Sequence, residues 1–171
     1  GWAAVRHALD PARMRFAEEG LVWAGAAVRL PQLIVACAEK GLGGAEPLVG
    51  VPGTVGGALV MNAGTRELQI GDVTVSVDVF DPESLETRRL GRAEVRFAYR
   101  STSLEGSLVL GEPLSLKAGD RGDIMGRVRR FQQQRLKTQP VHTFNVGSTF
   151  KNPPGRFVAK LIEDAGLKGC V

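Results

Sequence analysis

Hydrophobic residues recur along the chain with two different spacings, and each spacing predicts a different element. In Leu30 to Gly41, "LPQLIVACAEKG", they return every three or four positions, which predicts a helix with Pro31 near its start and Gly41 at its end. In Val73 to Asp81, "VTVSVDVFD", they alternate with polar residues, which predicts a half-buried strand. The chain therefore combines helices with strands.

The same pattern extends along the rest of the chain. A turn at Asp81-Pro82 leads into another predicted strand that ends near Arg89, and the segment 141–155 is irregular or rich in strand. Two further strands are predicted, at 21–27 and within 107–119. Two further helices are predicted, one at 123–139 that ends before Pro140 and one at 156–169 that ends at Gly166.

Strands and helices do not alternate regularly, so we expect an α+β fold rather than a doubly wound parallel sheet. The character of the sequence changes after the long predicted helix. We therefore divide the chain into residues 1–139 and 140–171.

Composition indicates an ordinary globular protein. The 171 residues, 43% hydrophobic and 23% charged, suffice for one core, or for one domain and the beginning of another. There is neither an apolar run of about 20 residues nor a signal pattern at the start, so we expect a cytoplasmic protein without a membrane partner. Two cysteines without a His/Cys cluster predict no metal site.

The net charge of +4 raises the question of a nucleic-acid partner. Basic residues concentrate in Gly126 to Lys137, where Phe131 is the one aromatic residue. Because stacking needs interleaved aromatic residues, we expect no nucleic-acid binding. The basic stretch is either the solvated face of a helix or a site for a small anion.

Five glycines lie in Gly50 to Gly64, "GVPGTVGGALVMNAG". The segment has neither the lysine of a Walker A loop nor the G-x-G-x-x-G spacing of a Rossmann fold. Thr54 is a candidate helix cap, and we expect the amides of Thr54 to Ala58 to face a pyrophosphate. The alternative is tight packing of backbone around the glycines.

This segment resembles the flavin-binding segment of the UDP-N-acetylenolpyruvoylglucosamine reductase (MurB) family, FAD enzymes of bacterial peptidoglycan synthesis. Three further segments resemble the family in the same order. "FAYRSTSL" at 97–104 is similar to its Tyr-Arg-x-Ser motif, "QPVHTFNVGSTFKNP" at 139–153 to its Gly-Ser-x-Phe-Lys-Asn-Pro motif, and "AKLIEDAGLKG" at 159–169 to the helix that follows. The resemblance covers most of the chain, from about Leu21.

The resemblance implies an incomplete FAD-binding domain of the MurB and vanillyl-alcohol-oxidase-like type in residues 1–139, followed by the beginning of a substrate-binding domain in 140–171. It implies FAD as cofactor and NADPH as co-substrate. The residues that it implies for FAD binding all lie in the segment 50–64. They are Gly50, Val51, Pro52, Gly53, Thr54, Gly56, Gly57, Asn62, Ala63 and Gly64.

The implied reaction is the reduction of UDP-N-acetylglucosamine enolpyruvate to UDP-N-acetylmuramate. Hydride addition to the alkene leaves negative charge next to a carboxylate, so the site needs a cation and a proton donor. The resemblance implies Arg100 as the cation and Ser148 as the proton donor, with Lys151 adding positive charge. Without the motifs, Arg100 would be an exposed arginine at a strand end and Ser148 a turn hydroxyl.

Other residues are expected to bind the sugar nucleotide. The resemblance implies hydrogen bonding by Asn152. Tyr99 either contacts the nucleotide or lies in the core. Arg135 and Lys137 are candidates for the phosphates, although solvation of a helix explains them as well.

Members of the family extend beyond this chain at both ends, with a Gly-Gly-Gly-Ser-Asn segment before it and a catalytic glutamate after it. Two alternative functions therefore stay open. One is a non-catalytic remnant that at most binds nucleotide, and the other is a different FAD oxidoreductase with the same flavin domain. The expected partner is the small-molecule substrate, and no obligate protein partner is inferred.

Overall fold

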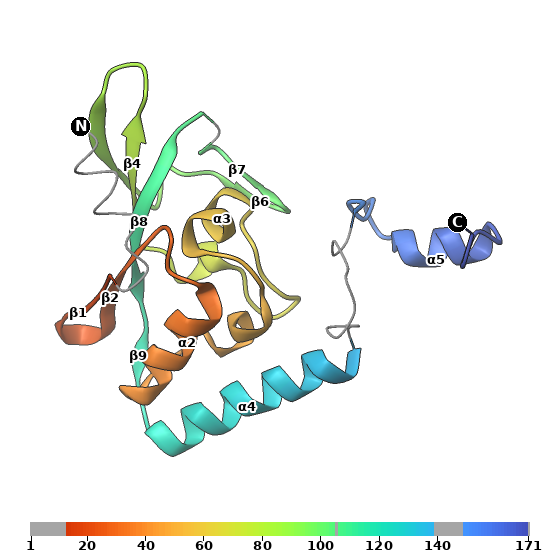
Figure 1. The fold of residues 1–171 in the computed structure, drawn as a ribbon, viewed down its shortest axis with the longest axis horizontal. Helices are drawn as coiled ribbons and strands as arrows, with labels where there is room; N and C mark the ends of the chain where they lie inside the picture. Colours follow the sequence, from red (N-terminus) through yellow and green to blue (C-terminus); the bar gives the residue numbers. More distant parts are fainter. Residues whose placement is uncertain (1–12, 105, 139–148, 171) are drawn as a thin grey trace. The chain divides into compact units, whose positions relative to one another are not determined.

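The structure of the chain is a computed structural model that describes residues 13–104, 106–138 and 149–170 (Figure 1). The chain divides into two compact units, Gly1–Thr138 and Gln139–Val171. We describe each unit by itself.

An antiparallel sheet of five strands, in the order β1-β2-β8-β4-β5, forms the frame of the first unit. Its central strand β8 pairs with β2 on one side and with β4 on the other. The α+β class is therefore confirmed. The strands are β1 (Met14–Phe16), β2 (Leu21–Gly25), β4 (Ser76–Asp81), β5 (Glu86–Gly91) and β8 (Leu108–Ser115).

The strand predicted from Val73 begins three residues later, at Ser76. A short 3₁₀ helix η3 (Ile70–Asp72) precedes it, and the amides of Val73 and Thr74 both donate to the carbonyl of Ile70 at 3.2 Å. The amides of these two residues therefore bond to the preceding turn, although the Val73 carbonyl already accepts from Ser115 and Thr74 forms an isolated bridge with Leu114 of β8.

The first predicted helix is confirmed as α2 (Leu30–Glu39), with Pro31 in its first turn. Gly41 follows its end with a φ of +71°, a left-handed conformation that glycine adopts without steric penalty. The long helix α4 (Arg121–Thr138) begins two residues earlier than predicted. It begins there because the Asp120 carboxylate accepts a hydrogen bond from the amide of Asp123 at 2.9 Å.

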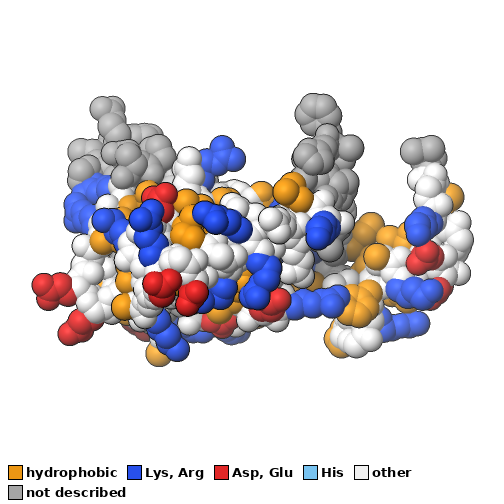
Figure 2. Space-filling model, turned by 90° about the horizontal axis from the view of Figure 1, so that it is seen from below, with side chains coloured by type: hydrophobic (Ala, Val, Ile, Leu, Met, Phe, Trp, Pro, Cys, Tyr) orange, Lys and Arg blue, Asp and Glu red, His pale blue; other side chains and the backbone are white. Residues whose placement is uncertain are grey.

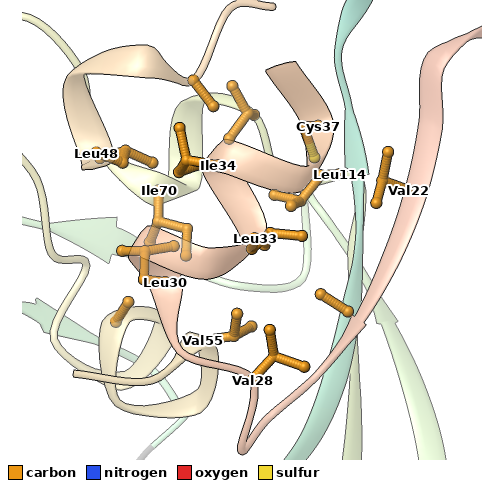
Figure 3. Packing of buried hydrophobic residues seen from close by; sticks show 14 of the residues in the cluster. Val22, Val28, Leu30, Leu33, Ile34, Cys37, Leu48, Val55, Ile70 and Leu114 are labelled. Carbon is orange, nitrogen blue, oxygen red and sulfur yellow. The ribbon is translucent and has the colours of Figure 1, made fainter. Parts of the chain in front are cut away.

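The hydrophobic core lies between α2 and the sheet (Figure 3). Leu33 and Cys37 of α2 are buried together with Val22 of β2 and Leu114 of β8. Each buried leucine contributes about 2 kcal/mol by removing its side chain from water. The same core includes residues of η2 (Glu46–Gly50) and α3 (Val55–Val60), and thereby supports the glycine-rich segment 50–64.

Two small antiparallel sheets of two strands each also belong to the first unit. In one, β3 (Leu42–Gly43) pairs with the distant β9 (Lys117–Ala118), and in the other β6 (Phe97–Ala98) and β7 (Ser101–Thr102) form a hairpin. A 3₁₀ turn, η1 (Glu18–Gly20), joins β1 to β2. No helix within the described ranges has both the length and the apolar character that a membrane crossing requires.

The second unit contains the helix α5 (Val158–Asp164), which lies within the predicted helix and is followed by Gly166 with a φ of +74°. The preceding segment is irregular over 149–157, whereas the predicted residues 141–148 lie outside the described residues. No side chain of α5 is buried. Figure 1 labels this helix.

Candidate functional site

The glycine-rich segment 50–64 runs from the end of η2 through a loop into α3 and out into a turn. Its loop is fixed to the start of α2 by an antiparallel bridge between Arg29 and Thr54. Thr54 caps α3, because its Oγ1 accepts a hydrogen bond from the amide of Gly57 at 3.3 Å. The predicted cap is thus confirmed.

The expectation that the amides of residues 54–58 face a ligand is mostly wrong. The amides of Val55 and Gly56 donate at 2.9 Å to the carbonyls of Val28 and Ala26, and that of Ala58 donates to the carbonyl of Thr54. The first two amides attach α3 to the segment that follows β2, and the third closes the first turn of α3, so none of the three is available to an anion.

In the loop that precedes α3, two backbone amides remain available. Those of Gly53 and Thr54 have no acceptor among the residues that the structure describes, since the bridge to Arg29 uses the neighbouring groups. Gly53 has a φ of +104°, which a side chain would disfavour. No atom of the described ranges would lie within 4 Å of a Cβ atom at Gly53, so none of them blocks an approaching group there.

Tight packing, the alternative to ligand binding, explains other glycines of the segment. A Cβ atom at Gly56 would lie 2.9 Å from the Cβ of Ala26, and one at Gly50 would lie 3.1 Å from the Cδ of Arg135. Gly57 is exposed and would meet only Thr54 Oγ1, at 3.6 Å. The exposed Gly53 and Gly57 and the available amides of Gly53 and Thr54 therefore suit a phosphate group, whereas Gly56 is required by the close packing against Ala26.

The side chain of Asn62 is buried and is fully engaged within the protein. Its Nδ2 donates to Gln69 Oε1 at 2.5 Å and to the carbonyl of Ala98 at 3.0 Å, and its Oδ1 accepts from the amide of Gly71 at 3.2 Å. Asn62 has a φ of +41°, which asparagine tolerates better than most residues. Its predicted FAD contact stays a prediction, and these bonds give the side chain a different task.

Tyr99 and Arg100 form the two-residue turn between β6 and β7. Arg100 is half-buried and has a φ of +54°, a conformation that costs a non-glycine residue about 1 kcal/mol or more. Tyr99 is 54% exposed, which places it on the surface rather than in the core. Figure 1 shows this hairpin beside α3.

The Phe97 side chain packs the β6–β7 hairpin against Gly71 and Arg92. Its ring occupies the place of a side chain at Gly71, where a Cβ atom would lie 2.5 Å from the ring. On its other side, the Arg92 guanidinium lies 4.3 Å from the ring centre, within the range of a cation–π interaction. Arg92 also donates to the carbonyl of Gly71 at 2.9 Å, so the contact is fixed in place.

The basic candidates on α4 have different surroundings. Lys137 is exposed near the end of the helix. Arg135 is half-buried beside Gly50, and burial lowers the pKa of its guanidinium. No hydrogen bond or ion pair joins Arg135 to another described residue, so its charge is available to a ligand.

The candidates in the second unit lie before α5. Lys151 is exposed, and Asn152 Oδ1 accepts a hydrogen bond from the amide of Val158 at 3.0 Å, at the start of the helix. Ser148 lies outside the described residues.

Charge on the surface is mixed. Figure 2 shows Lys and Arg side chains spread over the face in view, with Asp and Glu side chains between them. Over residues 13–104, 106–138 and 149–170, no three His, Cys, Asp or Glu side chains are grouped as a metal site would require.

Glu112 is a buried ionisable residue that the sequence analysis missed. It is 0% exposed, and burial raises the pKa of its carboxyl to about 8, partly offset by a hydrogen bond from Thr74. Oε1 of Glu112 has no hydrogen-bond partner in the part of the chain that the structure describes. The available signal was its position in β8 two residues before Leu114, which places both side chains on one face of the strand.

Comparisons with known proteins agree with this arrangement. A family model described as an FAD binding domain matches residues 8–88, and one described as the C-terminal domain of UDP-N-acetylenolpyruvoylglucosamine reductase matches residues 139–171. The fold and the glycine-rich segment thus define the first unit as an FAD-binding domain of α+β type.

Similarity to curated relatives shows which kind of FAD-binding protein the chain resembles. The chain is 47% identical to UDP-N-acetylenolpyruvoylglucosamine reductase of Caldicellulosiruptor bescii, over 77% of this chain and 43% of the relative. It is 40% identical to UDP-N-acetylenolpyruvoylglucosamine reductase 2 of Symbiobacterium thermophilum, over 91% of this chain and 51% of the relative. The crystal structure of the reductase (MurB) from Thermus caldophilus matches with a TM-score of 0.78 and 37% identity, over 91% of this chain and 56% of that one.

The chain belongs to the UDP-N-acetylenolpyruvoylglucosamine reductase family, so the resemblance found in its four motifs is confirmed. It spans about half the length of the curated relatives that it matches.

Proposed function

We propose that the chain forms part of a reductase that uses FAD and NADPH to convert UDP-N-acetylglucosamine enolpyruvate to UDP-N-acetylmuramate in peptidoglycan synthesis. The observation that carries the proposal is the attachment of the Tyr99–Arg100 hairpin to the glycine-rich segment. A cofactor-binding segment and a cationic side chain are thereby kept in one rigid assembly.

The glycine-rich segment is the proposed site of the FAD phosphates. The amides of Gly53 and Thr54 are the donors that the fold leaves available, and Gly57 leaves space beside them. When bound, FAD would supply the substrate with a hydride that comes from NADPH. The remaining chemistry falls to side chains of the protein.

Arg100 is proposed to hold the substrate carboxylate. A guanidinium forms two parallel hydrogen bonds with a carboxylate and keeps its charge at any physiological pH. The same contact stabilises the negative charge that develops on the substrate during reduction. The left-handed backbone of Arg100 supports this role, because strained conformations cluster at functional sites.

Ser148 is proposed to donate the proton that completes the reduction, with the positive charge of Lys151 favouring its loss. Asn152, Tyr99, Lys137 and Arg135 are proposed to bind the sugar nucleotide. Among them Arg135 has the strongest support, because its half-buried charge has no protein partner in the described part of the chain.

The two alternatives predict different spectra and activities. A non-catalytic remnant would lack bound flavin or would bind it without turnover. Another FAD oxidoreductase would oxidise NADPH without responding to the enolpyruvyl substrate. The strained Arg100 favours the proposed reductase, since flavin binding alone gives no reason for a charged residue in a left-handed turn.

The test begins with the absorption spectrum of the purified protein at its natural length and identification of the released chromophore. Released FAD and NADPH oxidation that depends on UDP-N-acetylglucosamine enolpyruvate are the expected results. Ser148→Ala should leave NADPH-dependent bleaching of the flavin unchanged and slow its recovery on adding substrate. A colourless protein that takes up no FAD would refute the proposal.

A further inference from the structure

We infer that Asn62 and Thr102 are positioning residues, whose side chains fix the Tyr99–Arg100 turn against the glycine-rich segment. The inference rests on the proposed function, because it concerns where Arg100 meets the substrate. It goes beyond that function because it states that two buried side chains determine the position of Arg100. Neither of these side chains touches the substrate.

One bond of this attachment is made on each strand of the hairpin. Asn62 Nδ2 donates to the carbonyl of Ala98 on β6, at 3.0 Å. Thr102 Oγ1 on β7 donates to the carbonyl of Val60 at the end of α3, also at 3.0 Å. The bonds lie on both sides of the two-residue turn, so together they restrict both its distance from α3 and its tilt.

Both donors are buried, which makes the bonds selective for one arrangement. Asn62 is 6% exposed and Thr102 is 7% exposed. Water has little access to replace either partner, so breaking a bond leaves a buried polar group without its partner. The two bonds therefore favour this position of the hairpin on α3.

Asn62 connects the turn to two further parts of the site. Through Gln69 and the amide of Gly71 it joins the backbone on which the Phe97 ring rests. Asn62 itself belongs to the glycine-rich segment. A movement of that segment is therefore transmitted to the turn by a direct hydrogen bond.

The turn has to be held accurately in place because it carries the long side chain of Arg100. A shift of about 1 Å in a positioned catalytic group can reduce a rate by about a hundredfold. The main chain of Arg100 is fixed by its neighbours rather than by its own conformational preference. Removal of the two bonds should therefore affect the arginine before it affects the fold.

The first experiment measures amide hydrogen exchange over residues 97–102 in the absence of substrate. Loss of one buried hydrogen bond predicts exchange faster by about tenfold in Thr102→Val, with Thr102→Ser close to the original protein. Asn62→Asp, which keeps the acceptor for Gly71 but loses the donor to Ala98, should act in the same direction. Unchanged exchange in both variants would overturn the inference.

Thr74→Val is the matched control. Thr74 is also a buried threonine whose hydroxyl lies at hydrogen-bond distance from a backbone carbonyl, that of Ile70, but it is not on the hairpin. It should lower overall stability without selectively accelerating exchange at 97–102. Equal acceleration in Thr74→Val and Thr102→Val would show a general loss of stability and refute a local role.

The second experiment is a double-mutant cycle on kcat/KM for substrate-dependent NADPH oxidation by the protein at its natural length. Thr102→Val should lower kcat/KM by about tenfold with Arg100 present, but by less than about twofold in an Arg100→Ala background. Equal effects in the two backgrounds would mean that Thr102 does not act through Arg100, and would overturn the inference.

The outcomes separate the two proposals. If the unaltered protein shows no substrate-dependent NADPH oxidation, the proposed function fails and the role in catalysis fails with it. The exchange experiment then decides by itself whether the two bonds fix the turn.

Discussion

Replacement of Glu112 by glutamine should remove most of the pH dependence of stability between pH 5 and pH 8. The Thr74 hydroxyl lies 2.7 Å from Glu112 Oε2 and 2.8 Å from the carbonyl of Ile70, but it has one proton. When Glu112 is ionised, the single hydroxyl proton of Thr74 is shared between the two acceptors. When Glu112 is protonated, the carboxyl can donate to Thr74 while Thr74 donates to Ile70, so each contact has a proton of its own. This geometry and the burial of Glu112 both favour the neutral carboxyl.

The magnitude follows from the pKa. In the unfolded chain Glu112 loses its proton near pH 4.5, whereas in the folded protein it keeps the proton until about pH 8. Between these values the folded state binds more protons than the unfolded state, so the free energy of unfolding falls as the pH rises. The loss approaches about 1.4 kcal/mol per pH unit, or about 3 kcal/mol from pH 5 to pH 8.

Glutamine retains the geometry, since its amide nitrogen donates to Thr74 as the protonated carboxyl does. The assay is urea unfolding of both proteins at pH 5, 6, 7 and 8. Glu112→Gln should be the more stable protein at pH 8 and show a flatter profile. Glu86→Gln, an exposed glutamate on β5 of the same sheet, is the control and should keep the original slope. An unchanged slope in Glu112→Gln would refute the reasoning.

Three further predictions concern stability and the site. Arg127→Ala should lower the free energy of unfolding by about 2 kcal/mol in urea titrations, because it leaves the buried Glu46 carboxylate, 2.7 Å away, without its charged partner. Gly56→Val should cost about 2 kcal/mol or more, measured in the same way, since even a Cβ atom would lie 2.9 Å from the Cβ of Ala26. Arg100→Gly should raise the melting temperature, because glycine relieves about 1 kcal/mol of strain at a φ of +54°, and should abolish substrate-dependent NADPH oxidation. A loss of stability in Arg100→Gly would argue against strain at this turn.

Part of the fold followed from local pattern. The spacing of apolar residues predicted α2, and Pro31 and Gly41 predicted its ends, because helix periods and caps depend on neighbours in sequence. Thr54 was predicted as a cap for the same reason. The family followed from four short motifs in a fixed order, which are local features as well.

The candidate site could be predicted only in part from local sequence patterns. The glycine-rich segment indicated a cofactor, but most of the amides expected to face it bond within the protein, two of them to Ala26 and Val28. That competition depends on a segment far from α3 in sequence. Ser148 is known only from its motif, and its role stays a prediction.

The sequence by itself determined the class of fold, the family and the residue types available for the chemistry. Tertiary structure decided which of these groups are available and which are engaged. The contacts that matter join residues 36 to 42 positions apart: Asn62 with Ala98, Thr74 with Glu112, and Thr102 with Val60. Hydrophobic spacing carries no information on such pairs, because each depends on how the sheet and α3 pack around one core.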